Sequence, residues 1–60
     1  MTLPSEPNML LSFINLKLRD QYSSLEDMIN ELDLDPQEIG AMLEKAGIRY
    51  DRENNQLKFK

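Results

Sequence analysis

Apolar side chains recur every three or four residues through most of the chain, the spacing typical of amphipathic helices. Residues 7–20 are predicted to form the first helix, because Pro7 suits the first helical position, where its missing N–H is not needed. Residues 24–32 are predicted to form the second helix, with Ser23 and Glu26 as its capping box. The apolar positions of this second helix fall at i, i+3, i+4 and i+7, namely Leu25, Met28, Ile29 and Leu32.

A third helix is predicted over residues 36–46 from the same kind of signals. Asp35 is the expected N-cap, and Gly47 supplies the left-handed residue that ends many helices. Leu34, in the short connection from the second helix, is expected to fill the space between the two helices. The predicted core face of the third helix consists of Ile39, Met42, Leu43 and Ala46.

The pattern changes to strict alternation after the third helix. Ile48 and Tyr50 are separated by one polar residue, and so are Leu57 and Phe59, as expected of two half-buried strands. The polar residues 51–55 between them end in two asparagines, which tolerate the left-handed backbone conformation. We therefore expect the two strands to form a hairpin.

The order helix, helix, helix, strand, strand predicts a single domain over residues 1–60. We expect a mainly α fold with a C-terminal β-hairpin, a three-helix domain similar to a winged helix-turn-helix. A chain of 60 residues buries only roughly 60% of the surface that its unfolded chain exposes. One thin core is therefore expected, without room for an enclosed catalytic pocket.

The composition gives little support to catalysis or metal binding. The chain has no cysteine and no histidine, so it lacks thiolate metal ligands, the usual zinc ligand and the usual neutral-pH proton shuttle. Asp33 and Asp35 come closest to a metal-binding pattern, but the glycine and the final glutamate of an EF-hand loop are absent. The serines have no histidine to activate them, and no glycine-rich loop could cradle phosphate. We predict that the protein is not an enzyme and has no cofactor, metal or small-molecule substrate.

Charge is distributed unevenly along the chain. Seven basic and eleven acidic residues give a net charge of −4, which argues against general phosphate binding and against attraction to an anionic membrane. Residues 23–47 hold seven acidic residues and one basic residue, and only Gln37 and Lys45 on the outer face of the third helix suit DNA contact. Residues 48–60 have a net charge of +2, which would also suit an edge strand protected from pairing with other sheets. Nucleic-acid binding is the alternative function, with these candidate contacts: Lys17, Arg19, Arg49, Arg52 and Lys58.

The first helix is apolar around more of its circumference than one core contact requires. At ~100° per residue its apolar side chains cover an arc of about 220°, whereas docking on one core needs about 100°. Neighbouring elements of so small a domain could fill this arc by themselves. The other interpretation is an isologous dimer patch, with the candidate residues Met9, Leu11 and Leu16. The opposite, polar face of the helix is expected to hold Ser12, Asn15 and Arg19.

No targeting or membrane segment is evident in the sequence. Residues 1–7 lack a basic segment, and the longest apolar run, residues 9–11, is far below the ~20 residues that span a bilayer. We expect a cytoplasmic protein that does not associate with membranes.

One string of residues resembles a known family: Leu3-Pro4-x-x-Pro7-x-Met9-Leu10-Leu11-Ser12-x-x-Asn15-x-Lys17-Leu18-Arg19-Asp20-x-Tyr22-x-Ser24-Leu25, with Asp33-x-Asp35 and Tyr50-Asp51…Asn55-Gln56. Over nearly the whole chain it is similar to a family of small uncharacterised bacterial proteins, a domain-of-unknown-function family. The resemblance implies a bacterial, cytoplasmic protein that stands alone, and it brings no activity, substrate or catalytic residue. The family pattern also places polar residues on the first helix, at Asn15, Lys17, Arg19 and Asp20, which would put a functional site there.

These observations favour a non-catalytic binding or assembly module. The leading hypothesis is protein–protein interaction with an unknown partner or with a second copy, through the first helix. Nucleic-acid binding through the hairpin together with Lys17 and Arg19 is the alternative, although the acidic net charge disfavours it. A regulatory or scaffold peptide without a fold of its own is the third class that the sequence allows.

Overall fold

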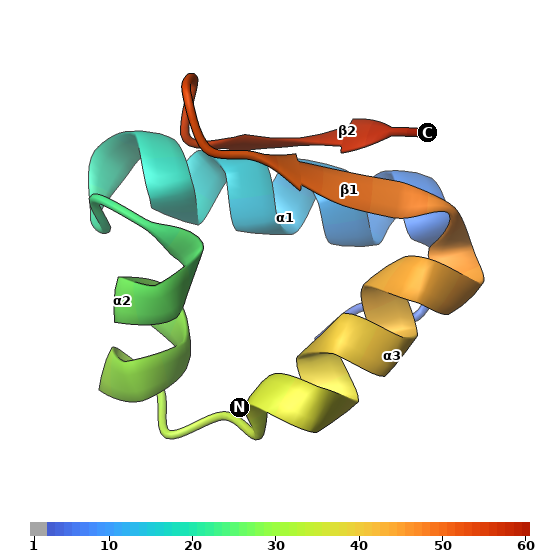
Figure 1. The fold of residues 1–60 in the computed structure, drawn as a ribbon, viewed down its shortest axis with the longest axis horizontal. Helices are drawn as coiled ribbons and strands as arrows, with labels where there is room; N and C mark the ends of the chain where they lie inside the picture. The colour runs from blue at the N-terminus through green and yellow to red at the C-terminus, as the bar shows by residue number, and fades with distance from the viewer. Residues whose placement is uncertain (1–2) are drawn as a thin grey trace.

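The computed structural model of the protein describes residues 3–60. Within them, three helices precede a two-stranded antiparallel sheet, and both strands run lengthwise along the long first helix (Figure 1). The second and third helices extend from the same side of the first helix, near its opposite ends (Figure 1). The prediction of a mainly α fold with a C-terminal β-hairpin is confirmed. The elements are α1 (Pro7–Asp20), α2 (Leu25–Glu31), α3 (Pro36–Ala46), β1 (Ile48–Asp51) and β2 (Gln56–Phe59).

Local capping fixes the ends of α1 and α3. The Glu6 carboxylate accepts a hydrogen bond from the Met9 N–H at 2.8 Å, and the proline that follows Glu6 occupies the first turn of α1. Asp35 caps α3 in the same way by accepting from the Gln37 N–H at 3.0 Å. Gly47 ends α3 in the left-handed conformation with φ 72°, as predicted. These boundaries follow from residues a few positions apart.

The predicted capping box of α2 is wrong by one residue. Ser24, rather than Ser23, is the N-cap, and its hydroxyl accepts from the Asp27 N–H at 3.0 Å. The Ser23 hydroxyl instead donates to the Asp27 carboxylate. The sequence contains two overlapping patterns of serine followed three residues later by an acidic residue. The pattern that ends at Glu26, which predicted the capping box, is not the one that the helix adopts. The helix therefore begins one residue later than the predicted 24–32, and it also ends one residue earlier, with Leu32 as its C-cap.

A single core lies between α1 and the other elements. α1 supplies one continuous row of it at intervals of four residues, and every other helix and strand adds at least one side chain. Leu34 and Met42 are half-buried against this cluster, in agreement with the prediction for the turn and for α3. The buried residues are Leu10, Ile14, Leu18, Met28, Ile29, Ile39, Leu43, Ile48 and Leu57.

The hairpin agrees with the alternating pattern except at its last apolar residue. Tyr50 is paired with Leu57 and Ile48 with Phe59 in the antiparallel register. Leu57 is buried, but Phe59 is 46% exposed, because it is the last paired residue of the ribbon and its partner Ile48 takes the core position. The predicted turn is confirmed at Asn55, which adopts φ 50°.

No helix within residues 3–60 has the length and apolar character needed to cross a membrane. The finer assignment to the winged helix-turn-helix class stays a prediction.

Candidate functional site

One face of α1 is left uncovered by the rest of the chain. Met9 is 61% exposed and Leu16 is 55% exposed, and seven residues, or two turns, separate them on the helix. Phe13 lies between them at helical spacing and is half-buried. We call Met9, Phe13 and Leu16 the α1 stripe. Leu11, the third residue predicted for self-association, lies about 200° from Met9 around the helix and does not belong to this stripe. Phe13 also packs partly on the core but lies about 40° from Met9.

Opposite charges flank the α1 stripe at its two ends. At the N-terminal end, the hydrogen bonds from the Met9 and Asn8 backbones hold the pKa of Glu6 below its ordinary value, so this carboxyl group is ionised. Toward the C-terminal end, the Lys17 ammonium lies 5.5 Å from the centre of the Phe13 ring, a cation–π contact. The Lys17 stem therefore covers part of the stripe while its charge remains at the edge.

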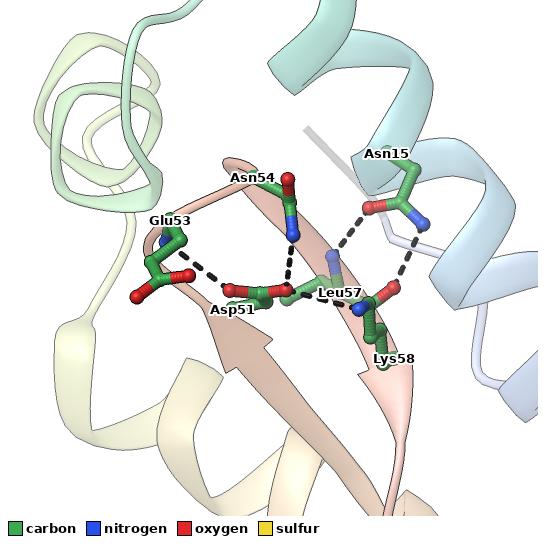
Figure 2. Close-up of polar contacts among 6 residues, drawn as sticks. All are labelled: Asn15, Asp51, Glu53, Asn54, Leu57 and Lys58. Atoms are coloured by element: carbon green, nitrogen blue, oxygen red, sulfur yellow. Dashed lines mark hydrogen bonds and ion pairs between the residues drawn. The ribbon is translucent and has the colours of Figure 1, made fainter.

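Asn15 is placed differently from the sequence prediction. The side chain was expected on the polar, outward face of the helix, but it is half-buried and faces β2. Its Oδ1 accepts from the Leu57 N–H at 2.6 Å, and its Nδ2 donates to the Leu57 carbonyl at 3.0 Å. Figure 2 shows this amide beside β2, on the side away from β1. Asn15 thus anchors the hairpin to α1 by imitating the main chain of a neighbouring strand.

A second polar cluster joins the hairpin turn to the helices. Asn55 Nδ2 donates to the carbonyls of Leu18 and Tyr22 at 3.2 and 3.0 Å. The Tyr50 hydroxyl donates to Asn55 Oδ1 at 2.7 Å and accepts from the Leu25 N–H at 3.3 Å. Every polar atom in this chain of contacts has a partner, which makes the cluster structural rather than reactive.

The residues predicted to contact nucleic acid do not form one basic surface. Lys17 and Arg19 are on α1, and Arg19 is paired with Asp20 at 3.3 Å. Lys58 is opposite Arg49 in the register, but its ammonium lies 3.0 Å from Asp51. Lys60, which also contributes to the positive charge of the hairpin, is paired with Glu44 at 2.6 Å. Within residues 3–60, the other three candidates, Lys17, Arg49 and Arg52, have no ion-pair partner.

The structure also places the weaker candidates. Gln37 and Lys45 are exposed on α3, as predicted. Asp33 and Asp35 are exposed, and Asp33 adopts φ 54° in the turn before α3. No group of three or more acidic residues within residues 3–60 is arranged to hold a metal ion.

Asp51 organises the hairpin turn. Its carboxylate accepts from the Glu53 N–H at 3.1 Å and from Asn54 Nδ2 at 2.8 Å, and it pairs with Lys58 (Figure 2). The hydrogen bond from Asn54, followed by the contact with Lys58, lowers the pKa of Asp51 from 3.8 to about 2. Asp51 is part of the family pattern, but its structural role could not be predicted, because its partners depend on the conformation of the turn.

Acid should therefore weaken the folded state through Asp51. Because the pKa is lower in the folded than in the unfolded chain, the ionised carboxyl group stabilises the fold above pH 3.8, and this contribution is lost as the pH falls toward about 2. In an Asp51→Asn variant, the free energy of unfolding should depend less steeply on pH between these values. Urea unfolding of both proteins from pH 2 to 6 measures the difference. Identical pH profiles would contradict the assignment.

The structural observations define a class: a small domain of three helices and a C-terminal hairpin, with an uncovered apolar face on its longest helix. The chain belongs to the family described as Domain of unknown function (DUF4250), which matches residues 4–57. This agrees with the resemblance to a domain-of-unknown-function family. Comparison with curated proteins and with solved structures gave no match.

Proposed function

We propose that the protein is a non-catalytic assembly module that associates with a second copy of itself through the α1 stripe. The observation that carries this proposal is the exposure of Met9 and Leu16 on one side of a helix whose other side is in the core. Burying a large apolar side chain contributes about 1.5–3 kcal/mol, so a domain with a thin core gains considerably by pairing these residues.

The charges of α1 favour an antiparallel, two-fold arrangement. In such a pair Met9 of one copy packs beside Leu16 of the other, because both lie at similar distances from the middle of the stripe. The same symmetry brings the ionised Glu6 of each copy near Lys17 of its partner. Parallel packing would place Glu6 beside Glu6 and Lys17 beside Lys17, which is unfavourable.

A charge in the α1 stripe should abolish self-association. Leu16→Glu and Met9→Glu each bury a carboxylate in the interface, and each should raise the dimer dissociation constant by at least about a hundredfold. The matched control is Gln37→Glu, which adds the same charge on the exposed side of α3. Sedimentation equilibrium at protein concentrations up to about 1 mM measures the constants. A wild-type protein that stays monomeric over this range refutes the proposal.

Nucleic-acid binding through Lys17, Arg19, Arg49, Arg52 and Lys58 stays a prediction. Ion pairs occupy Arg19 and Lys58, and the three remaining candidates, Lys17, Arg49 and Arg52, would displace few counterions from a nucleic acid.

A further inference from the structure

The two outer edges of the hairpin differ in whether their main-chain N–H and carbonyl groups are hydrogen-bonded. On β2, the N–H and the carbonyl of Leu57 point away from β1, since both bond to the Asn15 side chain. In an antiparallel pair, opposite residues either exchange both bonds or point both groups outward. Tyr50, the partner of Leu57, must therefore direct its N–H and carbonyl away from β2. The hydrogen bond from the Lys60 N–H to the Gly47 carbonyl, at 2.8 Å, agrees with this alternation.

Within the described part of the chain, the outer edge of β1 therefore has unbonded main-chain groups at the position where the main-chain groups on the outer edge of β2 are hydrogen-bonded. No hydrogen bond to the main-chain N–H or carbonyl of Tyr50 forms within residues 3–60. Such a residue can exchange two hydrogen bonds with one residue of an added strand. An added strand would have to lie beside β1, because Asn15 occupies the equivalent position on β2.

A groove of about 380 Å³ adjoins this open position, between β1 and α2. Leu25, Ile29 and the Tyr50 side chain give it an apolar lining, and the polar part of the lining includes Glu26 and Arg52. The residue of an added strand that lies opposite Tyr50 has its side chain on the same face of the sheet as Tyr50. That side chain would enter the groove, and its two neighbours in the strand would point to the outer face.

The charges along the groove specify those neighbours. Arg49 is exposed on the outer face of β1, and neither Arg49 nor Arg52 has an ion-pair partner within residues 3–60. In antiparallel addition, the residue that follows the apolar one lies opposite Arg49, where a carboxylate would be within reach of the guanidinium group. The residue that precedes it lies opposite the ionised Asp51, which would repel a second carboxylate. We propose that the groove between β1 and α2 binds an extended peptide segment of a partner protein, with an apolar side chain followed by one acidic residue.

This strand-addition site is independent of the α1 stripe, because it uses β1 and α2. A suitable probe is a capped pentapeptide with a central leucine, a glutamate directly after it and threonines at the other three positions. Titrated into the ¹⁵N-labelled protein, it should move the Tyr50 amide signal and leave the Leu57 signal in place, with a Kd of about 1 mM or tighter. The same peptide with an N-methylated leucine cannot donate to the Tyr50 carbonyl, and its Kd should be about tenfold higher.

Charge exchange tests Arg49. The Arg49→Glu variant should lose the glutamate peptide and bind the corresponding lysine peptide instead. The control Arg19→Glu, which reverses an exposed charge on α1, should leave the Kd unchanged within about twofold. An unmoved Tyr50 signal, or equal binding of the N-methylated peptide, overturns the proposal. So does a short single-stranded DNA that moves the Arg49 and Arg52 signals while the peptide does not, since the arginines would then serve nucleic acid.

Discussion

Replacing Asn15 with alanine is expected to unfold most of the protein or to lower its free energy of unfolding by about 3 kcal/mol. The variant leaves both the N–H and the carbonyl of the buried Leu57 without partners, at about 1–3 kcal/mol for each group. A domain of this size has only about 3–5 kcal/mol of stability in total. Urea unfolding followed by circular dichroism measures the loss.

Two further observations separate this effect from a change in helix propensity. Ser12→Ala introduces the same residue at an exposed position of α1 and should change the free energy of unfolding by less than about 0.5 kcal/mol. In the folded fraction of Asn15→Ala, the Leu57 amide should exchange with solvent faster than in the wild type. If the Leu57 amide keeps its protection and stability is unchanged, Asn15 does not anchor the hairpin.

Replacing Asn55 with alanine is the second change with a large expected effect, again about 3 kcal/mol of unfolding free energy. The substitution removes the hydrogen bonds to the carbonyls of Leu18 and Tyr22 and the one from the Tyr50 hydroxyl. It also forces a residue with a Cβ atom, but without a polar side chain, to adopt φ 50°. Thermal unfolding should show a decrease of the midpoint by more than about 10 °C.

The two causes can be separated with Asn55→Gly. Glycine adopts the positive φ without strain, so this variant should recover about 1 kcal/mol relative to alanine while still lacking the three hydrogen bonds. Asn54→Ala, at the neighbouring exposed position of the turn, serves as the control and should cost less than about 1 kcal/mol. Equal stability of the alanine and glycine variants would mean that the backbone conformation of Asn55 is not strained.

The elements of this fold could be predicted because their signals are local. Pro7, Asp35 and Gly47 define helix ends through contacts with residues a few positions away, and the structure has the predicted ends at all three. The same locality explains the error in α2, where Ser23 and Ser24 give nearly equal signals and only the backbone geometry selects Ser24. Leu57 is buried and Phe59 is exposed, although both occupy apolar positions of the same alternating pattern.

The candidate sites were predicted less completely. The excess of apolar residues on α1 made Met9, Leu11 and Leu16 candidates for self-association, with burial against neighbouring elements as the other interpretation. In the structure Met9 and Leu16 are exposed and Leu11 packs on the core. Arg49 and Arg52 were identified by their charge alone. The groove beside Tyr50 had no signal in the sequence, because it depends on how α2 lies against β1.

By itself, the sequence determined the order of the elements, most of their ends and the amphipathic face of each, because these properties depend on spacing and on caps within one or two turns. Only the tertiary structure decided which polar residues face inward. Asn15 contacts Leu57 across 42 positions of the chain, and Asn55 contacts Leu18 across 37. A polar residue on a helix or turn has the same local signal whether it faces water or the main chain of a distant strand. The packing of α1 against β2 makes that choice, and with it leaves the outer edge of β1 open.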